Sequence, residues 1–304
     1  MRKKILEELY TAAKKNKKIV FIGSDLGPDI LKNFKKDFPD RFFMEGAAEQ
    51  NLISSASGMA HEGFIPYVNT IASFLTRRCY EQIYINLGMH KSKVRLIANG
   101  GGVVYAPLGP THLALDDISL LKNIPNMTIL VPADSVEVIK MMRATINHNG
   151  PIYFRIAKGG DPISTEGMYK KFKIGKPYKI GKEYKNIIVS TGVMLDTALK
   201  IRKELNSKKK QIGIVHCPTI KPLDSSEIKK IFKKTVNVIT IEEHGLIGGL
   251  GSTINDFLKL EKNKKITNLG FPDSFVKGYG RQHEMLKKYN LDFSGILKKI
   301  KKII

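Results

Sequence analysis

Glu49 stands where an apolar run gives way to a helical pattern, and three small residues, Gly46, Ala47 and Ala48, come just before it. Small side chains let a ligand approach the backbone closely, so a carboxyl group here could share a proton with that ligand. The same placement also suits an ordinary helix start, because a negative charge there offsets the helix dipole. The residue types alone leave both roles open.

His112 lies in a glycine-rich stretch without charged residues, Leu96 to Leu115, which includes the run Gly100 to Gly102. Its glycines and prolines prevent a membrane-spanning helix, so the stretch is rich in loops. Histidine is the side chain best suited to moving protons near neutral pH. In irregular backbone it is therefore a catalytic candidate, and the alternative is that it caps the following helix.

The composition limits the classes of protein to consider. The chain has 304 residues, 42% of them hydrophobic, which allows about two domains of ~150 residues. The net charge is +23, but the lysines are scattered and no aromatic residues are interleaved, so we expect solvated faces and no nucleic-acid partner. Two cysteines, and histidines without ligand spacing, predict no metal site. The charged N-terminus is unlike a signal peptide, which predicts a cytoplasmic protein without membrane contact.

Elements alternate regularly in the first half of the chain. Predicted helices cover residues 49–60, 74–89 and 135–147, and Ser135 is the expected cap of the last. The predicted strands between and around them are short apolar runs at residues 19–22, 42–44, 65–68, 94–98, 127–131 and 152–156. Such alternation is typical of an α/β domain with a mainly parallel sheet covered by helices.

A second alternating series follows a change of composition. Residues 161–184 are rich in glycine, lysine, tyrosine and proline, which indicates a linker or two short edge strands. Strand patterns then return at residues 186–190, 211–215 and 236–241. We therefore predict two α/β domains, residues 1–165 and 185–304, joined by a linker at 166–184.

The segment Phe42 to Asn51 reads Phe-Phe-Met-Glu-Gly-Ala-Ala-Glu-Gln-Asn. It resembles the strand–turn–helix of the pyrimidine-binding domain in transketolases and 1-deoxyxylulose-5-phosphate synthases, whose usual pattern is R-F-x-x-x-G-I-A-E-Q. Further similar stretches occur in the family's order, so that the resemblance spans nearly the whole chain: Ser73-Phe74-Leu75, Gly109-Pro110-Thr111-His112, Ile124 to Met127 with Pro132-Ala133-Asp134, and Glu242-Glu243-His244 with Gly248 to Gly251.

The resemblance implies a thiamine-diphosphate-binding fold followed by a transketolase C-terminal fold, and it implies roles for particular residues. Glu49 would hydrogen-bond the pyrimidine N1′ of thiamine diphosphate, a role that needs a dry pocket. Phe74 would stack on the pyrimidine, and Asp25 would lie near the cofactor. His112 would face the oxygens of the donor ketose and help to move their protons.

Substrate recognition is implied by basic residues far apart in the sequence. Arg2 and Lys158 match phosphate-binding arginines of the family, although lysine replaces the bidentate fork by a point charge. Leu108 and the run Gly100 to Gly102 stand where the family usually has polar side chains. Backbone N–H groups of the glycines could form an anion nest instead. We therefore expect a sugar or sugar phosphate acceptor of unusual shape.

The resemblance also implies a partner. Full-length transketolases carry an additional diphosphate-binding domain with a G-D-G…N segment that holds Mg²⁺, and this sequence has no such segment. We therefore expect the C-terminal subunit of a split transketolase, active in a heterotetramer with an N-terminal subunit that supplies the Mg²⁺ ligands. The alternatives are a decarboxylating enzyme, similar to deoxyxylulose-phosphate synthase or a 2-oxo-acid dehydrogenase β-subunit, and a non-catalytic homologue.

Overall fold

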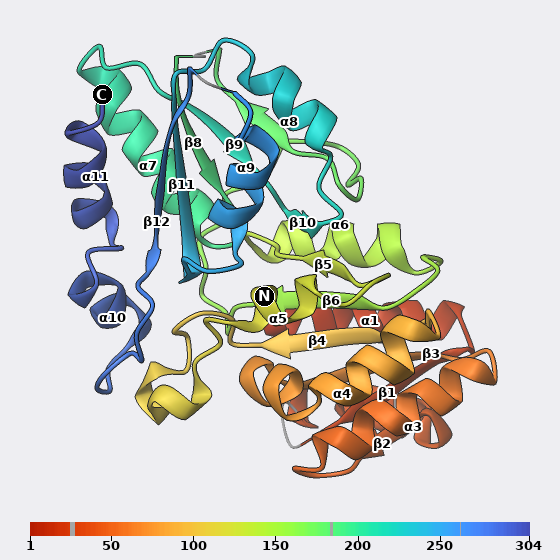
Figure 1. Ribbon diagram of the computed structural model, residues 1–304. Coiled ribbons are helices and arrows are strands. Elements are labelled where there is room, and N and C mark those ends of the chain that lie inside the picture. The colour runs from red at the N-terminus through yellow and green to blue at the C-terminus, as the bar shows by residue number, and fades with distance from the viewer. Residues whose placement is uncertain (25–27, 183–184, 262) are drawn as a thin grey trace.

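The computed structural model describes residues 1–24, 28–182, 185–261 and 263–304. A seven-stranded sheet forms its lower half in Figure 1, in the order β10-β5-β6-β4-β3-β1-β2. All neighbours pair in parallel except β10, which is antiparallel to β5. The strands are β1 (Ile19–Gly23), β2 (Phe42–Met44), β3 (Ile65–Ile71), β4 (Arg95–Asn99), β5 (Thr128–Leu130), β6 (Ile152–Ile156) and β10 (Thr219–Lys221).

Helices cover both faces of this sheet. One core lies beneath α1 (Arg2–Lys15) and α6 (Ser135–Thr145), where α1 buries the apolar stripe of Ile5, Leu6 and Leu9. The opposite core lies beneath α3 (Glu49–His61), α5 (Asp117–Lys122) and the helical segment 74–89. The shorter helices are α2 (Lys32–Asp37), η1 (Pro28–Leu31), η2 (Pro39–Arg41), η5 (Ala106–Leu108) and η6 (Pro110–His112).

The helix expected over residues 74–89 is present, but most of it is wound as a π-helix. It consists of η3 (Phe74–Arg78), α4 (Tyr80–Gln82) and η4 (Ile83–Met89), of which η3 and η4 are π-helical. Wider winding rotates the side chains relative to an ordinary α-helix, and such segments are frequent at functional sites.

A five-stranded sheet forms the second domain, in the order β12-β11-β8-β9-β7. Its strands are β7 (Tyr178–Ile180), β8 (Asn186–Ser190), β9 (Gly213–His216), β11 (Asn237–Gly245) and β12 (Lys265–Phe271). Only β7, within the expected linker, pairs in the antiparallel sense. The helices are α7 (Met194–Ser207), α8 (Ser225–Phe232), α9 (Leu250–Leu258), α10 (Gln282–Lys288) and α11 (Phe293–Lys301). The expected two-sheet α/β architecture is confirmed.

Two of the differences from the sequence expectations concern the start of α6 and strand β10. The cap of α6 is Asp134 and not Ser135: its Oδ1 accepts the N–H groups of Val136 and Glu137. Strand β10 was not predicted, because it is short and partly polar and pairs only with the sheet of the other domain. No helix in the described part of the chain is long and apolar enough to cross a membrane.

Candidate functional site

The residues singled out in the sequence follow strands of the first sheet. Glu49 begins α3 a few residues after β2, Phe74 follows β3, and His112 follows β4. These three strands run parallel with β1 between β2 and β3, so their carboxyl ends meet at one edge of the sheet. Ligands of open α/β sheets bind at that edge.

Glu49, Phe74 and His112 lie in one chain of contacts through Arg78. The carboxyl group of Glu49 is buried, with 2% of the side chain exposed, and its Oε2 accepts a hydrogen bond of 2.6 Å from Arg78 Nη1. The guanidinium carbon of Arg78 lies 4.6 Å from the centre of the Phe74 ring. The ring of Phe74 meets that of His112 at 4.9 Å, edge to face. The structure therefore brings three predicted site residues together.

Arg78 was missed by the reasoning from sequence. The signal for it was its position four residues after Phe74 on the same helix, which places two side chains on one helical face. The next residue, Cys79, is buried, and burial together with the negative charge of Glu49 raises the pKa of its thiol to about 12. The thiol is therefore protonated and unreactive near neutral pH.

The contacts of Arg78 test whether this site suits thiamine diphosphate. A thiamine pyrimidine that carries a proton on its ring nitrogen would donate a hydrogen bond to Glu49 and stack on Phe74. The flat guanidinium of Arg78 makes both contacts. Arg78 is 46% exposed, so its side chain can leave without disturbing the core. The buried carboxyl and the adjacent aromatic ring thus fit the pyrimidine, with the guanidinium as its stand-in.

His112 belongs to a loop and does not cap the following helix. It ends η6, its Nδ1 is 3.0 Å from Thr111 Oγ1, and α5 begins only at Asp117. Arg77 fixes the end of this loop: its guanidinium donates to the carbonyl of Leu113 and forms a bidentate ion pair with Asp116. The imidazole is therefore held against Phe74 by the loop backbone.

The run Gly100 to Gly102 does not form the anion nest that was considered. The N–H groups of Gly100 and Gly101 donate to the carbonyl of Ile156, and that of Gly102 donates to Ala114. Each glycine instead makes room for a side chain, because an added Cβ would lie 2.1 Å from Tyr105, 2.7 Å from Arg155 and 2.4 Å from Glu243, respectively. The run is therefore a packing feature.

Arg2 and Lys158 lie beside the glycine-rich loop. The guanidinium of Arg2 is close enough to Tyr105 to oppose the rise in pKa that burial causes in this hydroxyl. The amino group of Met1 pairs with Asp161 at 3.6 Å, which places α1 next to the segment that carries the exposed Lys158. The described contacts join neither residue to Glu49 or Phe74. Asp25 lies outside the described residues, and within them no cluster suited to a metal ion occurs.

A buried cluster of charges joins the two domains. Arg155 donates to Asp117 at 2.7 Å and to the backbone carbonyl of Glu243 at 3.0 Å. Burial raises the pKa of Glu242 and of Glu243 to about 7 and lowers that of His244 to about 4. Burial alone would also raise the pKa of Asp117, but the charges of Arg155 and His244 hold it below its ordinary value.

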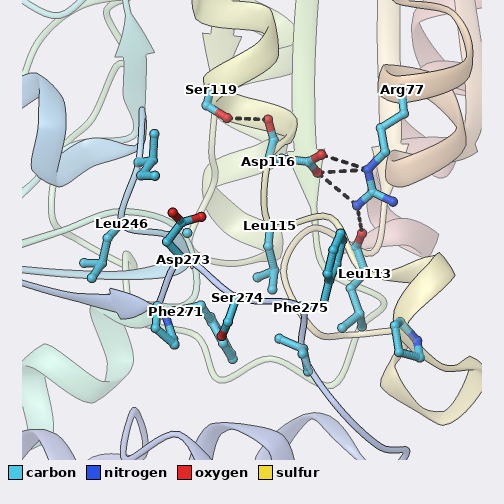
Figure 2. A pocket seen from close by; sticks show the side chains of 15 residues that line it. Arg77, Leu113, Leu115, Asp116, Ser119, Leu246, Phe271, Asp273, Ser274 and Phe275 are labelled. Carbon is cyan, nitrogen blue, oxygen red and sulfur yellow. Dashed lines mark hydrogen bonds and ion pairs between the residues drawn. The ribbon is translucent and has the colours of Figure 1, made fainter.

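A cavity of about 680 Å³ opens between the domains next to this site (Figure 2). Its wall is mostly apolar and includes Leu115 and Phe271, with the Arg77–Asp116 ion pair at one side. The lining residues include neighbours of His112 but not Glu49, Phe74 or His112. The predicted site residues thus lie beside the cavity.

Comparison with known proteins identifies both domains. Residues 1–160 match the model of the transketolase pyrimidine binding domain, and residues 179–296 match that of the transketolase C-terminal domain. The chain is 31% identical to one subunit of the apulose-4-phosphate transketolase of Phocaeicola vulgatus, over 98% of this chain and 95% of that protein. It is 33% identical to 1-deoxy-D-xylulose-5-phosphate synthase of Clostridium kluyveri, over 98% of this chain but 47% of the synthase.

A solved structure described as "Split gene transketolase, inactive beta4 tetramer" has the same fold. It matches with a TM-score of 0.87 and 30% identity, covering 99% of this chain and 96% of that one. The chain therefore spans about half the length of the synthase relative and nearly the whole length of the split proteins.

Proposed function

This chain belongs to the transketolase family, and we propose that it is the subunit of a split transketolase that carries the pyrimidine-binding and C-terminal domains. The complete enzyme transfers a two-carbon ketol unit from a ketose to an aldose. The observation that carries this proposal is the chain of contacts from Glu49 through Arg78 and Phe74 to His112. The match to the Phocaeicola transketolase subunit over nearly its whole length supports it.

Each residue of the site has a separate role in the proposed reaction. When bound, thiamine diphosphate supplies the carbanion chemistry. Glu49 holds a proton at the pyrimidine nitrogen, and its burial keeps water from competing for that hydrogen bond. Phe74 supports the face of the ring. His112 moves protons on the oxygens of the sugar, and Arg2 and Lys158 bind its phosphate.

The remaining ligands come from a partner in this proposal. An N-terminal subunit supplies the groups that hold the diphosphate and Mg²⁺, and two copies of each subunit form a heterotetramer. Asp25 lies outside the described residues, and its role at the cofactor rests on the resemblance alone. The proposal rests on the family's division of labour and on the Phocaeicola relative, whose name describes it as a transketolase subunit.

An assay of the assembled enzyme tests the reaction. The chain is combined with a purified N-terminal subunit, Mg²⁺ and thiamine diphosphate, and is given either a ketose with an aldose or a 2-oxo acid with an aldose. We expect two-carbon transfer from the ketose without release of CO₂. Turnover of the 2-oxo acid would favour the synthase-like alternative, which the Clostridium relative keeps open, and no turnover with either donor would indicate a non-catalytic homologue.

The proposed acceptor sugar has an unusual shape, because the side chain of Leu108 offers no hydrogen bond and the residue is 53% exposed. The N–H groups of Gly100 to Gly102 are occupied and cannot replace the missing side chains. A site without these partners does not reject a sugar that lacks the matching hydroxyl. Deoxy or branched sugar phosphates should therefore serve at least as well as ribose 5-phosphate, and a preference for ribose 5-phosphate above about tenfold in kcat/KM (~1.4 kcal/mol) would contradict this.

A further inference from the structure

The loop that carries His112 is in contact with the C-terminal domain near its beginning and again further along. It runs from the end of β4 to the start of α5, and in Figure 1 this yellow segment lies between α4 and the blue α10. Val103, near its beginning, is fully buried, and its N–H donates a 2.8 Å hydrogen bond to Glu243 Oε1 on β11. Further along, Gly109 lies so close to the ring of Tyr279 that an added Cβ would be 2.7 Å from it.

Glu243 is itself held in place for this contact. Gln282, the first residue of α10, donates from Nε2 to both carboxyl oxygens, at 3.0 and 2.8 Å. Gly102 has no side chain, and only this lets the carboxyl approach the loop. The result is a continuous path from α10 through Gln282 and Glu243 to the backbone that leads to His112.

We propose that Glu243 is a positioning residue for His112: through the Val103 N–H, this carboxyl from the C-terminal domain fixes the loop that holds the imidazole against Phe74. The effect on catalysis rests on the proposed function, in which His112 moves protons on the sugar. The anchoring of the loop by Glu243 is independent of that function. The C-terminal domain would thereby position a residue of the active site, although none of its side chains need contact the cofactor.

Of the two adjacent glutamates, Glu242 and Glu243, we assign the positioning of the loop to Glu243 alone. Both are buried, and burial raises the pKa of both carboxyls to about 7. Within the described part of the chain, however, Glu242 accepts its hydrogen bonds from the N–H groups of Leu250 and Gly251, at the start of α9 in its own domain. Removing Glu242 should therefore disturb α9, whereas removing Glu243 leaves the buried N–H of Val103 without an acceptor.

Hydrogen exchange of the full-length chain tests the position of the loop without any assay of activity. In Glu243→Leu we expect the amides of residues 103–112 to exchange at least about tenfold faster than in the wild type. Glu243→Gln keeps an acceptor oxygen and should restore slow exchange. Glu242→Ala should speed exchange in α9 and not in 103–112. Unchanged exchange of 103–112 in Glu243→Leu, or equal acceleration in Glu242→Ala, would overturn the proposal.

A second, milder variant tests the anchoring of the loop even if Glu243→Leu does not fold. Gln282 is only partly buried, and Gln282→Ala removes the donors that hold the Glu243 carboxyl. If Glu243→Leu does not fold, faster exchange of 103–112 in Gln282→Ala supports the proposal, and unchanged exchange there contradicts it.

The assembled enzyme tests whether Glu243 acts through His112. A displacement of the imidazole by about an ångström should lower kcat about 10- to 100-fold, with the KM for the cofactor unchanged. The double variant Glu243→Leu/His112→Ala should be no slower than His112→Ala alone. Multiplying effects would show independent roles and overturn the proposal. If the wild type transfers no ketol unit at all, the proposed function fails, whereas the exchange experiment still decides the loop's anchor.

Discussion

Among the described residues, Glu49 is hydrogen-bonded to Arg78, and it would have a different partner during the reaction. Its carboxyl group accepts a hydrogen bond from Arg78, whose cation pairs best with the ionised form. The proposed role needs the same carboxyl group to hold a proton at the pyrimidine nitrogen. The guanidinium must therefore move away when the cofactor binds.

Replacing Glu49 by glutamine tests this role. The change keeps nearly the same shape but removes the acid, so we expect kcat of the assembled enzyme to fall by about 10²-fold or more. Circular dichroism and thermal unfolding should show that the fold is retained. Ketol transfer at close to the wild-type rate would mean that the carboxyl group is structural and only begins α3.

Replacing Arg78 by methionine tests the competition. Loss of the guanidinium removes the group that occupies Glu49, so the affinity of the assembled enzyme for thiamine diphosphate should rise about fivefold, which is the ~1 kcal/mol of a half-exposed ion pair. Arg143→Met is a matched control, because Arg143 pairs with Glu8 on the surface. Calorimetric titration measures both variants. Weaker binding in Arg78→Met would show that Arg78 holds the cofactor.

At the scale of elements, the strands are predictable where they are continuously apolar. All five residues of β1, β4 and β6 are buried, and mostly apolar runs identified them, although Arg95 and Asn99 lie in β4 and Arg155 lies in β6. Strand β12 was missed because it lies at the edge of its sheet and is half-polar. The site residues could likewise be predicted only from local patterns. Such patterns identified Glu49, Phe74 and His112. The hydrogen bond between Val103 and Glu243 could not be predicted in this way, because the two residues are far apart in the sequence.

Three titratable residues at the end of β11 should make the free energy of unfolding depend on pH in two opposing ways. Burial raises the pKa of Glu242 and Glu243 from 4.5 to about 7, so their contribution to stability is lost as the pH rises through that range. Burial lowers the pKa of His244 from 6.5 to about 4, so its contribution is gained as the pH rises from 4 to 6.5. Between pH 4.5 and 6.5 the histidine offsets one of the two carboxyls.

Removing His244 should uncover the effect of the carboxyls. In His244→Asn we expect the free energy of unfolding to fall more steeply between pH 4.5 and 6.5 than in the wild type, and in parallel with it above pH 6.5. Urea unfolding at a series of pH values measures both slopes. Identical profiles for the two proteins would show that His244 does not titrate differently on folding.

At the scale of the whole molecule, the two domains are interlocked. Strand β10 comes from the second half of the chain but completes the first sheet, and Arg155 bonds to groups in both domains. The boundary at residue 165 and the linker over 166–184 remain predictions. Local composition could not reveal that β10 would pair with the sheet of the first domain. The loop of His112 depends on both domains at once.

In the proposed enzyme, this chain carries one half of a thiamine-diphosphate site. Isothermal titration calorimetry with Mg²⁺ and thiamine diphosphate tests it directly, first with the chain alone and then with an added N-terminal subunit. We expect no measurable binding by the chain alone, because the charges of the diphosphate lack their ligands, and clear binding once the partner is present. Micromolar affinity of the chain alone, or no binding by the mixture, would show that the site is not divided between the two subunits in this way.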